Sequence, residues 1–335
     1  MSTSTFTNHH DTTELSIVIP MHNEGEMLHI LFEKLIEILK VTNKNYEIIC
    51  IDDGSTDDTL PKLRAFASQD ERIKIIAFSR NFGKEAALTA GLGYASGEDI
   101  VPMDADLQDP PELIIDFLRK REEGFDVVVG LRVDRNSDTF FKKFSAELYY
   151  RIFNFLSPQK IQTNVGDFRL MSRRVVQEIL KLSERDRFMK GLFSWVGFPT
   201  TAVEYCRPKR AAGKSKWGIA ALLNHGVSGI CSFTATPLRL WTYTGFLFFG
   251  FAMIYILFVV LKKLIIGDPV AGYSSMMVII LLIGGIQSLG LGVMGEYIAR
   301  LVVETKRRTL YIVAETINCP RRTFAETNQY GPERD

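Results

Sequence analysis

Two carboxylates stand one residue apart just after an apolar run in the first third of the chain, Asp104 and Asp106. Side chains two positions apart in an extended strand point the same way, so both carboxylates can reach one ion. With Gln108 nearby, they offer the hard oxygen ligands of Mg²⁺ or Mn²⁺, which keep positions open for substrate phosphates. Because open α/β sheets bind ligands at the carboxyl ends of their strands, this spacing predicts a metal and phosphate site there.

Polar residues also end two earlier apolar runs, and they predict a nucleotide site. Asn23 and Glu24 follow the first run, whereas Asp52 and Asp53 end the second, just before Gly54. Glycine permits a tight turn at that point. The paired aspartates therefore lie where ribose hydroxyls or base N–H groups would be bound.

The elements that position these residues alternate between strand and helix from residue 15 to residue 206. Strands are predicted over 15–20, 46–52, 73–78, 99–104, 126–131, 168–171 and 200–206. Helices are predicted over 24–41, 57–69, 84–95, 110–123, 139–156 and 172–182. Asp57 and Asp58, in the first turn of one predicted helix, would alternatively only cap it and favour its dipole. The alternation predicts an α/β fold with a mostly parallel sheet and helices on both faces.

The C-terminal third has the composition of membrane-spanning helices. No charged residue occurs over 240–261 or over 270–295, and either stretch can cross about 30 Å of hydrocarbon as a helix. Two buried helices of a soluble core are the alternative. We predict a two-helix transmembrane hairpin, with helices over 237–266 and 270–299.

Basic residues indicate how this hairpin crosses the membrane. They gather before the first span and after the second, whereas only Lys262 and Lys263 lie in the connection. Since basic loops stay in the cytoplasm, we expect the domain over 15–206 and both termini on the cytoplasmic side of the plasma (inner) membrane. Residues 1–14 lack an apolar signal core and are predicted to be a disordered tail, and 300–335 is predicted to be a second tail.

Five motifs together resemble those of the inverting family 2 glycosyltransferases. They lie at 18–24, 52–57, 80–84, 104–110 and 166–171, in the family's order. More narrowly, the chain resembles the polyprenyl-phosphate branch, which includes dolichol-phosphate mannose synthases and bacterial bactoprenol glucosyltransferases. The resemblance runs from about Leu15 to about Arg308 and implies a GT-A type nucleotide-sugar-binding domain. The tail beyond Arg308 adds nothing recognisable.

The resemblance implies a role for residues in each motif. Asp167 is implied as the catalytic base, and Asp104, Asp106 and Gln108 as ligands of Mg²⁺ or Mn²⁺. The nucleotide sugar would be bound by Pro20, Asn23, Glu24, Asp52, Asp53, Lys84 and Asp104. An acceptor phosphate needs little base, because a phosphate monoester has its second pKa near about 6. Asp167 would then alternatively orient a substrate, or form an ion pair with Arg169.

The segment over 207–236 joins the domain to the membrane, and basic residues precede an apolar stretch in it. Four residues there are predicted to hold a lipid phosphate: Arg207, Lys214, Ser215 and Lys216. The last three resemble part of the family's Gly-x-Ser-Lys loop. Anchoring to anionic lipids is the alternative for the whole basic run. Arg132, at the end of a predicted strand, is a further phosphate candidate and would equally suit a structural ion pair.

The expected reaction moves one sugar from a nucleotide diphosphate sugar to a polyprenyl phosphate, with inversion at the anomeric carbon. UDP-glucose is the first choice of donor, while GDP-mannose and other UDP-sugars remain open. A processive polysaccharide synthase is disfavoured because the chain lacks a Gln-x-x-Arg-Trp motif, and a non-catalytic scaffold because the acids and Lys84 are intact. A net charge of +1 gives no field for nucleic acid. Membrane lipids are expected partners, and the family suggests a homo-oligomer packed through the spans.

Overall fold

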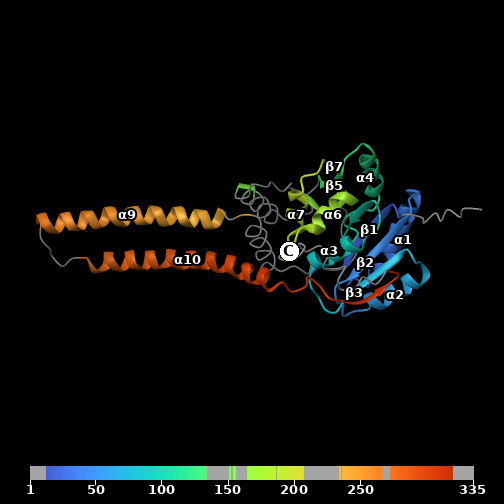
Figure 1. The fold of residues 1–335 in the computed structure, drawn as a ribbon, viewed down its shortest axis with the longest axis horizontal. Helices are drawn as coiled ribbons and strands as arrows, with labels where there is room; N and C mark the ends of the chain where they lie inside the picture. Colours follow the sequence, from blue (N-terminus) through green and yellow to red (C-terminus); the bar gives the residue numbers. More distant parts are fainter. Residues whose placement is uncertain are drawn as a thin grey trace, which may run out of the picture.

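The computed structural model describes residues 13–133, 151, 154–155, 164–185, 187–206, 234, 236–266 and 272–319. These residues form an α/β domain and two long helices that run side by side away from it (Figure 1). The chain that follows the second long helix returns to the domain, so the domain contains residues from both ends of the described sequence.

An 8-stranded sheet forms the centre of the domain. Its strands are β1 (Leu15–Met21), β2 (Tyr46–Asp52), β3 (Ile73–Phe78), β4 (Asp99–Pro102), β5 (Val127–Arg132), β6 (Val165–Ser172), β7 (Thr200–Tyr205) and β8 (Val313–Ile317). Their order across the sheet is β7-β5-β6-β4-β1-β2-β3-β8. β6 and β8 run antiparallel to their neighbours, and all other neighbours are parallel. The predicted α/β fold with a mostly parallel sheet is confirmed.

Apolar side chains alternate between the two faces of the sheet, because successive residues of a strand point opposite ways. In β1, Ile17 and Ile19 join one buried cluster and Val18 joins the other. The first cluster includes residues of α1 (Leu28–Val41), α2 (Thr59–Gln69) and α4 (Leu113–Glu122). The second includes residues of α3 (Lys84–Tyr94), α6 (Arg173–Lys181) and α7 (Met189–Trp195). Each fully buried Ile or Val adds about 1.5–3 kcal/mol of stability.

Helix boundaries depart from the sequence pattern near the site. The helix predicted from residue 24 begins at Leu28, because Asn23 takes a left-handed φ of 55° and the chain turns before the helix starts. The short helix α7 has no counterpart among the predicted elements. The helix predicted over 139–156 lies almost wholly outside the described residues.

Two long helices, α9 (Thr236–Ile266) and α10 (Tyr273–Lys306), occupy the region predicted as a hairpin. They approach closely at Gly290 of α10, where an added Cβ would lie 1.9 Å from the indole of Trp241. Among the described residues, one stretch, Leu282–Lys306, is long and apolar enough to cross a membrane. The second helix was expected to end at residue 299, and it continues to Lys306 instead.

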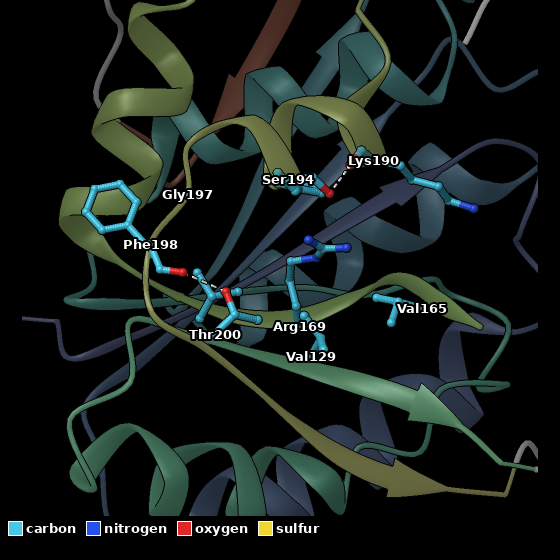
Figure 2. A pocket seen from close by; sticks show the side chains of 10 residues that line it. Val129, Val165, Arg169, Lys190, Ser194, Gly197, Phe198 and Thr200 are labelled. Atoms are coloured by element: carbon cyan, nitrogen blue, oxygen red, sulfur yellow. Dashed lines mark hydrogen bonds between the residues drawn. The ribbon is translucent and has the colours of Figure 1, made fainter. Parts of the chain in front are cut away.

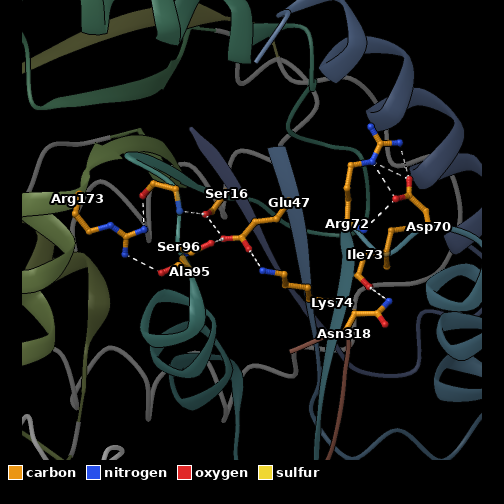
Figure 3. Close-up of polar contacts among 11 residues, drawn as sticks. Ser16, Glu47, Asp70, Arg72, Ile73, Lys74, Ala95, Ser96, Arg173 and Asn318 are labelled. Carbon is orange, nitrogen blue, oxygen red and sulfur yellow. Dashed lines mark hydrogen bonds and ion pairs between the residues drawn. The ribbon is translucent and has the colours of Figure 1, made fainter. Parts of the chain in front are cut away.

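The prediction that the domain ends at residue 206 is wrong, because the C-terminal tail supplies an edge strand. β8 pairs antiparallel with β3, with Ile317 opposite Ile75. Beside it, the Asn318 side-chain amide donates to the carbonyl oxygen of Ile73 at 2.9 Å (Figure 3) and to that of Ala67 at 2.8 Å. A strand this short, placed after long apolar helices, gives no periodic signal of its own.

Candidate active site

Three residues from distant parts of the sequence meet at the carboxyl edge of the sheet: Lys84, Asp104 and Asp167. Lys84 begins α3, Asp104 follows β4, and Asp167 lies in β6. The ammonium nitrogen of Lys84 lies 2.6 Å from Asp104 Oδ1 and 2.7 Å from Asp167 Oδ2. The antiparallel direction of β6 makes this possible, because it brings the first residues of β6 to the edge where β4 ends.

The charges of this cluster keep each other ionised. Burial opposes the charge on Lys84, but the carboxylates of Asp167 and Asp104 outweigh it and hold the pKa of Lys84 well above its ordinary value. Burial likewise opposes the charge on Asp167, but Lys84 and Lys190 outweigh it and hold the pKa of Asp167 well below its usual range. A carboxylate with so low a pKa is a weak proton acceptor at neutral pH. Its environment therefore suits orientation of a substrate better than general-base work.

Glu85 is a half-buried acid of this region that the sequence patterns do not single out. Its carboxylate accepts a hydrogen bond from the backbone N–H of Met189 at 3.1 Å and so ties α3 to the start of α7. Burial, with a smaller contribution from the Asp167 charge, raises the pKa of Glu85 to about 7. In the sequence, Glu85 is marked by its place next to Lys84 at the start of a predicted helix. That position can be interpreted only once the fold is known.

Two predicted nucleotide ligands, Asp53 and Asn23, bind loops of the protein itself. The carboxylate of Asp53 accepts the backbone N–H groups of Phe82 and Gly83 at 2.6 and 2.9 Å. The side-chain oxygen of Asn23 accepts the N–H of Thr56 at 2.8 Å. These bonds fix the three loops that follow β1, β2 and β3 against one another. Both residues thus build the carboxyl edge at which a nucleotide would lie.

The other predicted nucleotide residues lie along the same edge. Pro20 is in β1, opposite Ile51 of β2, and Glu24 donates its backbone N–H to Thr59 Oγ1 at 2.9 Å. Asp52 is buried at the end of β2, and burial raises its pKa above the ordinary value despite hydrogen bonds from Ser55.

The acids that follow this group stabilise the start of α2. Asp57 Oδ1 accepts the N–H of Thr59 at 3.0 Å, and its other oxygen accepts the N–H of Gly25 at 3.2 Å. Asp58 forms an ion pair with Lys62 at 2.7 Å. The contacts of Asp57 match the capping alternative, whereas the side chain of Asp58 makes no capping hydrogen bond and pairs with Lys62 instead.

The predicted metal ligands lie in one turn after β4. Asp106 is buried, and its Oδ1 accepts the N–H of Gln108 at 3.1 Å across Leu107, which has a φ of 54°. Among the described residues, no three His, Cys, Asp or Glu side chains are grouped as a metal site. Asp104 and Asp106 still fit Mg²⁺ or Mn²⁺ in donor chemistry, since Mg²⁺ is usually held by one or two carboxylates and substrate phosphates.

Most of the predicted lipid-phosphate residues, Arg207, Lys214, Ser215 and Lys216, lie outside the described residues. Arg132 is described and ends β5 at the carboxyl edge. Its Nε is buried and has no hydrogen-bond partner among the described residues. Burial and Asp109 raise the pKa of the neighbouring Tyr205, and the guanidinium of Arg132 partly opposes this rise.

Both parts of the chain match known families. Residues 16–180 match the glycosyl transferase family 2, and residues 236–301 match the GtrB C-terminal hairpin. An uncharacterized glycosyltransferase of Synechocystis is 47% identical over 91% of this chain and 96% of its own length. The bactoprenol glucosyl transferase of Shigella phage SfV is 44% identical over 90% of this chain and 98% of its own.

Further similarities extend to Escherichia coli and to a solved structure. A prophage bactoprenol glucosyl transferase homolog of Escherichia coli K12 is 45% identical over 90% of this chain and 98% of its own. The crystal structure of glucosyl-3-phosphoglycerate synthase from Mycobacterium tuberculosis with Mn²⁺, UDP and phosphoglyceric acid is 22% identical. The structural match covers 68% of this chain and 78% of the synthase chain, with a TM-score of 0.44.

Proposed function

Because the chain belongs to the glycosyl transferase family 2, with a GT-A-like α/β domain and a GtrB C-terminal hairpin, we propose that it transfers glucose from UDP-glucose to polyprenyl phosphate. The product is a polyprenyl-phosphate glucose. The observation that carries the proposal is the Lys84 cluster with Asp104 and Asp167 at the carboxyl edge of the sheet. It occurs in a chain similar over most of its length to bactoprenol glucosyl transferases.

The reaction is a displacement at the anomeric carbon. An oxygen of the acceptor phosphate attacks that carbon, and the nucleotide diphosphate leaves with the bonding electrons, so an α-linked donor gives a β-linked product. The acceptor phosphate is already largely ionised at neutral pH, because its second pKa is near about 6. Asp167, held ionised by Lys84, therefore orients the sugar and the acceptor and keeps the ammonium group of Lys84 in place.

Lys84 supplies a permanent positive charge where the diphosphate would lie. Its ammonium group is held between two carboxylates, one in the turn after β4 and one in β6, so it needs little reorganisation when charge develops on the leaving group. Asp104 and Asp106 would hold a divalent cation, which when bound neutralises charge on the diphosphate. Asp53 and Asn23 would keep the nucleotide loops in register by the hydrogen bonds described above.

We infer that α9 and α10 both cross the membrane. Their apolar side chains are largely exposed, among them Leu257 and Leu291, and buried core helices would not leave them so. The match of 236–301 to a C-terminal hairpin supports the inference. Basic residues on both sides of the pair then put the domain and both termini in the cytoplasm. A homo-oligomer packed through these helices is part of the same proposal.

Transfer of label from donor to lipid tests the reaction. Purified full-length protein in detergent, given undecaprenyl phosphate and radiolabelled UDP-glucose, should produce an organic-extractable lipid whose label is released by mild acid. A panel with GDP-mannose and other UDP-sugars should give less product. Label that enters a growing polymer, or no labelled lipid with any donor, would overturn the proposal.

A further inference from the structure

A pocket of about 150 Å³ lies between α7 and the sheet, close to Asp167. Its lining comes from β5, β6, α7 and the loop that leads into β7: Val127, Val129, Val165, Arg169, Lys190, Phe193, Ser194, Gly197, Phe198 and Thr200. Figure 2 shows Arg169 rising from its strand toward α7, and Lys190 extending from α7 away from Arg169, toward the side of the pocket where Val165 lies. Five of the lining side chains are apolar, two are the cations Arg169 and Lys190, and two carry a hydroxyl group.

Arg169 is a buried cation whose hydrogen-bonding capacity is not filled. Its exposed fraction is 5%, and one guanidinium nitrogen donates to the carbonyl oxygen of Gly166 at 2.7 Å. The guanidinium carbon lies 3.9 Å from the centre of the Phe193 ring. Nε has no hydrogen-bond partner among the described residues. Burial lowers the pKa of Arg169 to about 10 despite the Asp167 charge, which indicates that no acid compensates it fully.

Within the part of the chain that the structure describes, the two cations of the pocket have no direct ion pair. Lys84 is paired with both Asp104 and Asp167. Neither Lys190 nor Arg169 has a carboxylate within 4.0 Å among the described residues. A buried donor without a partner costs about 1–3 kcal/mol, and more when it is charged. Arg169 is such a donor, and Lys190, which is half-buried, adds a second positive charge to the same cavity, so the lining favours an anion.

The pocket also lies where the anion could take part in the reaction. Asp167 and Arg169 are two residues apart in β6, so both point to the α7 side of the sheet. That spacing puts them about 7 Å apart along the strand. A phosphate held by Arg169 would therefore lie beside the Asp167 and Lys84 pair, whose ammonium nitrogen and carboxylate oxygen are 2.7 Å apart.

We propose that Arg169 and Lys190 bind the phosphate group of the acceptor lipid, with the apolar wall of the pocket against the first carbons of its chain. This rests on the proposed function. The guanidinium fork suits two oxygens of a phosphate, and the lysine adds a third, charge-assisted contact. The site is separate from the sequence-predicted lipid-phosphate residues.

Kinetics of three variants in detergent test the proposal. Lys190→Gln and Arg169→Lys should each raise the KM for polyprenyl phosphate by about 10-fold or more, because a charge-assisted hydrogen bond is lost. The KM for UDP-glucose should change by less than about 2-fold. Lys181→Gln is the matched control, since Lys181 is exposed and pairs with Glu178 away from the pocket. A raised KM for UDP-glucose, or a lower kcat with both KM values unchanged, would overturn the proposal.

Chemical labelling tests binding without catalysis. In the full-length protein, farnesyl phosphate should slow acetylation of Lys190 by acetic anhydride, measured by mass spectrometry, but not acetylation of Lys181. Farnesol, which lacks the phosphate, should protect neither. Equal protection by inorganic phosphate at the same concentration would assign the pocket to free phosphate and overturn the lipid assignment, as would no protection by farnesyl phosphate.

The two experiments separate this proposal from the proposed reaction. If wild-type protein makes no glucosylated lipid but farnesyl phosphate protects Lys190, the reaction is wrong and the phosphate pocket stands. If wild-type protein makes the lipid and neither variant changes the acceptor KM, the reaction stands and the pocket assignment is wrong.

Discussion

Two buried charged clusters lie at opposite edges of the sheet, and they differ in how completely their groups are paired. At the amino edge, Glu47 accepts hydrogen bonds from Ser16 Oγ at 2.5 Å, from Ser96 N and Oγ at 2.6 and 2.9 Å, and from Lys74 (Figure 3). Burial raises the pKa of Glu47, but these donors outweigh it and hold that pKa below its ordinary value. The amino-edge cluster is closed: its charge is satisfied by the protein alone.

At the carboxyl edge the pairing is incomplete. Glu85 has its pKa raised to about 7, and Arg169 keeps a buried donor without a partner. Unsatisfied groups of this kind cost stability, and proteins retain them chiefly where they bind or react. The comparison teaches that burial of charge alone does not mark a site, since Glu47 is only 2% exposed and yet is fully paired. Incomplete pairing of the charged groups is what distinguishes the carboxyl-edge cluster from the amino-edge cluster.

The largest effect is expected at Asp167. Asp167→Asn should lower kcat by about 100-fold or more and leave UDP-glucose binding nearly unchanged. Because the low pKa keeps this carboxylate ionised, the defect should be constant from about pH 7 upward. The pH profile of kcat and a direct donor-binding measurement check this. Rescue of activity at high pH would make Asp167 a proton acceptor instead, and weakened donor binding would place it at the nucleotide.

Asp106→Asn should have the next largest effect. It keeps the shape of the side chain and removes one ligand charge, so we expect about a 100-fold loss of turnover with the fold retained. Titration of the wild-type enzyme with a chelator and with Mg²⁺ or Mn²⁺ should reproduce the loss and its recovery. Turnover near the wild-type value, insensitive to chelator, would remove Asp106 from the metal site.

Glu47 tests the opposite side of the comparison. Glu47→Gln should lower the free energy of unfolding by about 3 kcal/mol, because Lys74 loses its buried partner. The KM values of the protein that remains folded should equal those of wild type. Denaturant unfolding and kinetics at low temperature measure the two quantities. A changed KM with unchanged stability would mean that the amino-edge cluster is functional.

The smallest effect is expected at Glu85 and depends on pH. The folded protein holds this proton up to about pH 7, whereas an unfolded glutamate loses it near about pH 4.3. Between these values the folded state binds more protons, so this carboxyl destabilises the fold increasingly as pH rises. The Tm of Glu85→Gln should therefore rise relative to that of wild type by a few degrees as the pH increases from 5 to 8. A change of 1 kcal/mol in the free energy of unfolding corresponds to about 2–4 °C in Tm. A constant difference in Tm would show that Glu85 does not titrate there.

The sequence predicted the strands and the acid pair well, because apolar runs and strand-end acids are local signals. It could not predict that β6 runs antiparallel between β4 and β5, and only that direction brings Asp167 to Lys84. Arg169 was considered as an ion-pair partner of Asp167, but its stacking on Phe193 depends on α7, which is too short to show a helical period. Which charged groups pair at the carboxyl edge of the sheet therefore depends on elements that meet only in the folded protein.

Strand β8 completes the sheet of the domain with a segment that is made only after α10. Asn318 bonds to Ile73 across 245 positions of sequence, and Tyr311 stacks on Phe78 with ring centres 5.0 Å apart. During synthesis β3 is made long before β8, so its outer edge lacks a partner until both long helices have left the ribosome. An unpaired edge strand invites association with other chains. Chains truncated within α9 or α10 would thus expose the edge of β3 and tend to associate through it, whereas full-length chains cover that edge with β8.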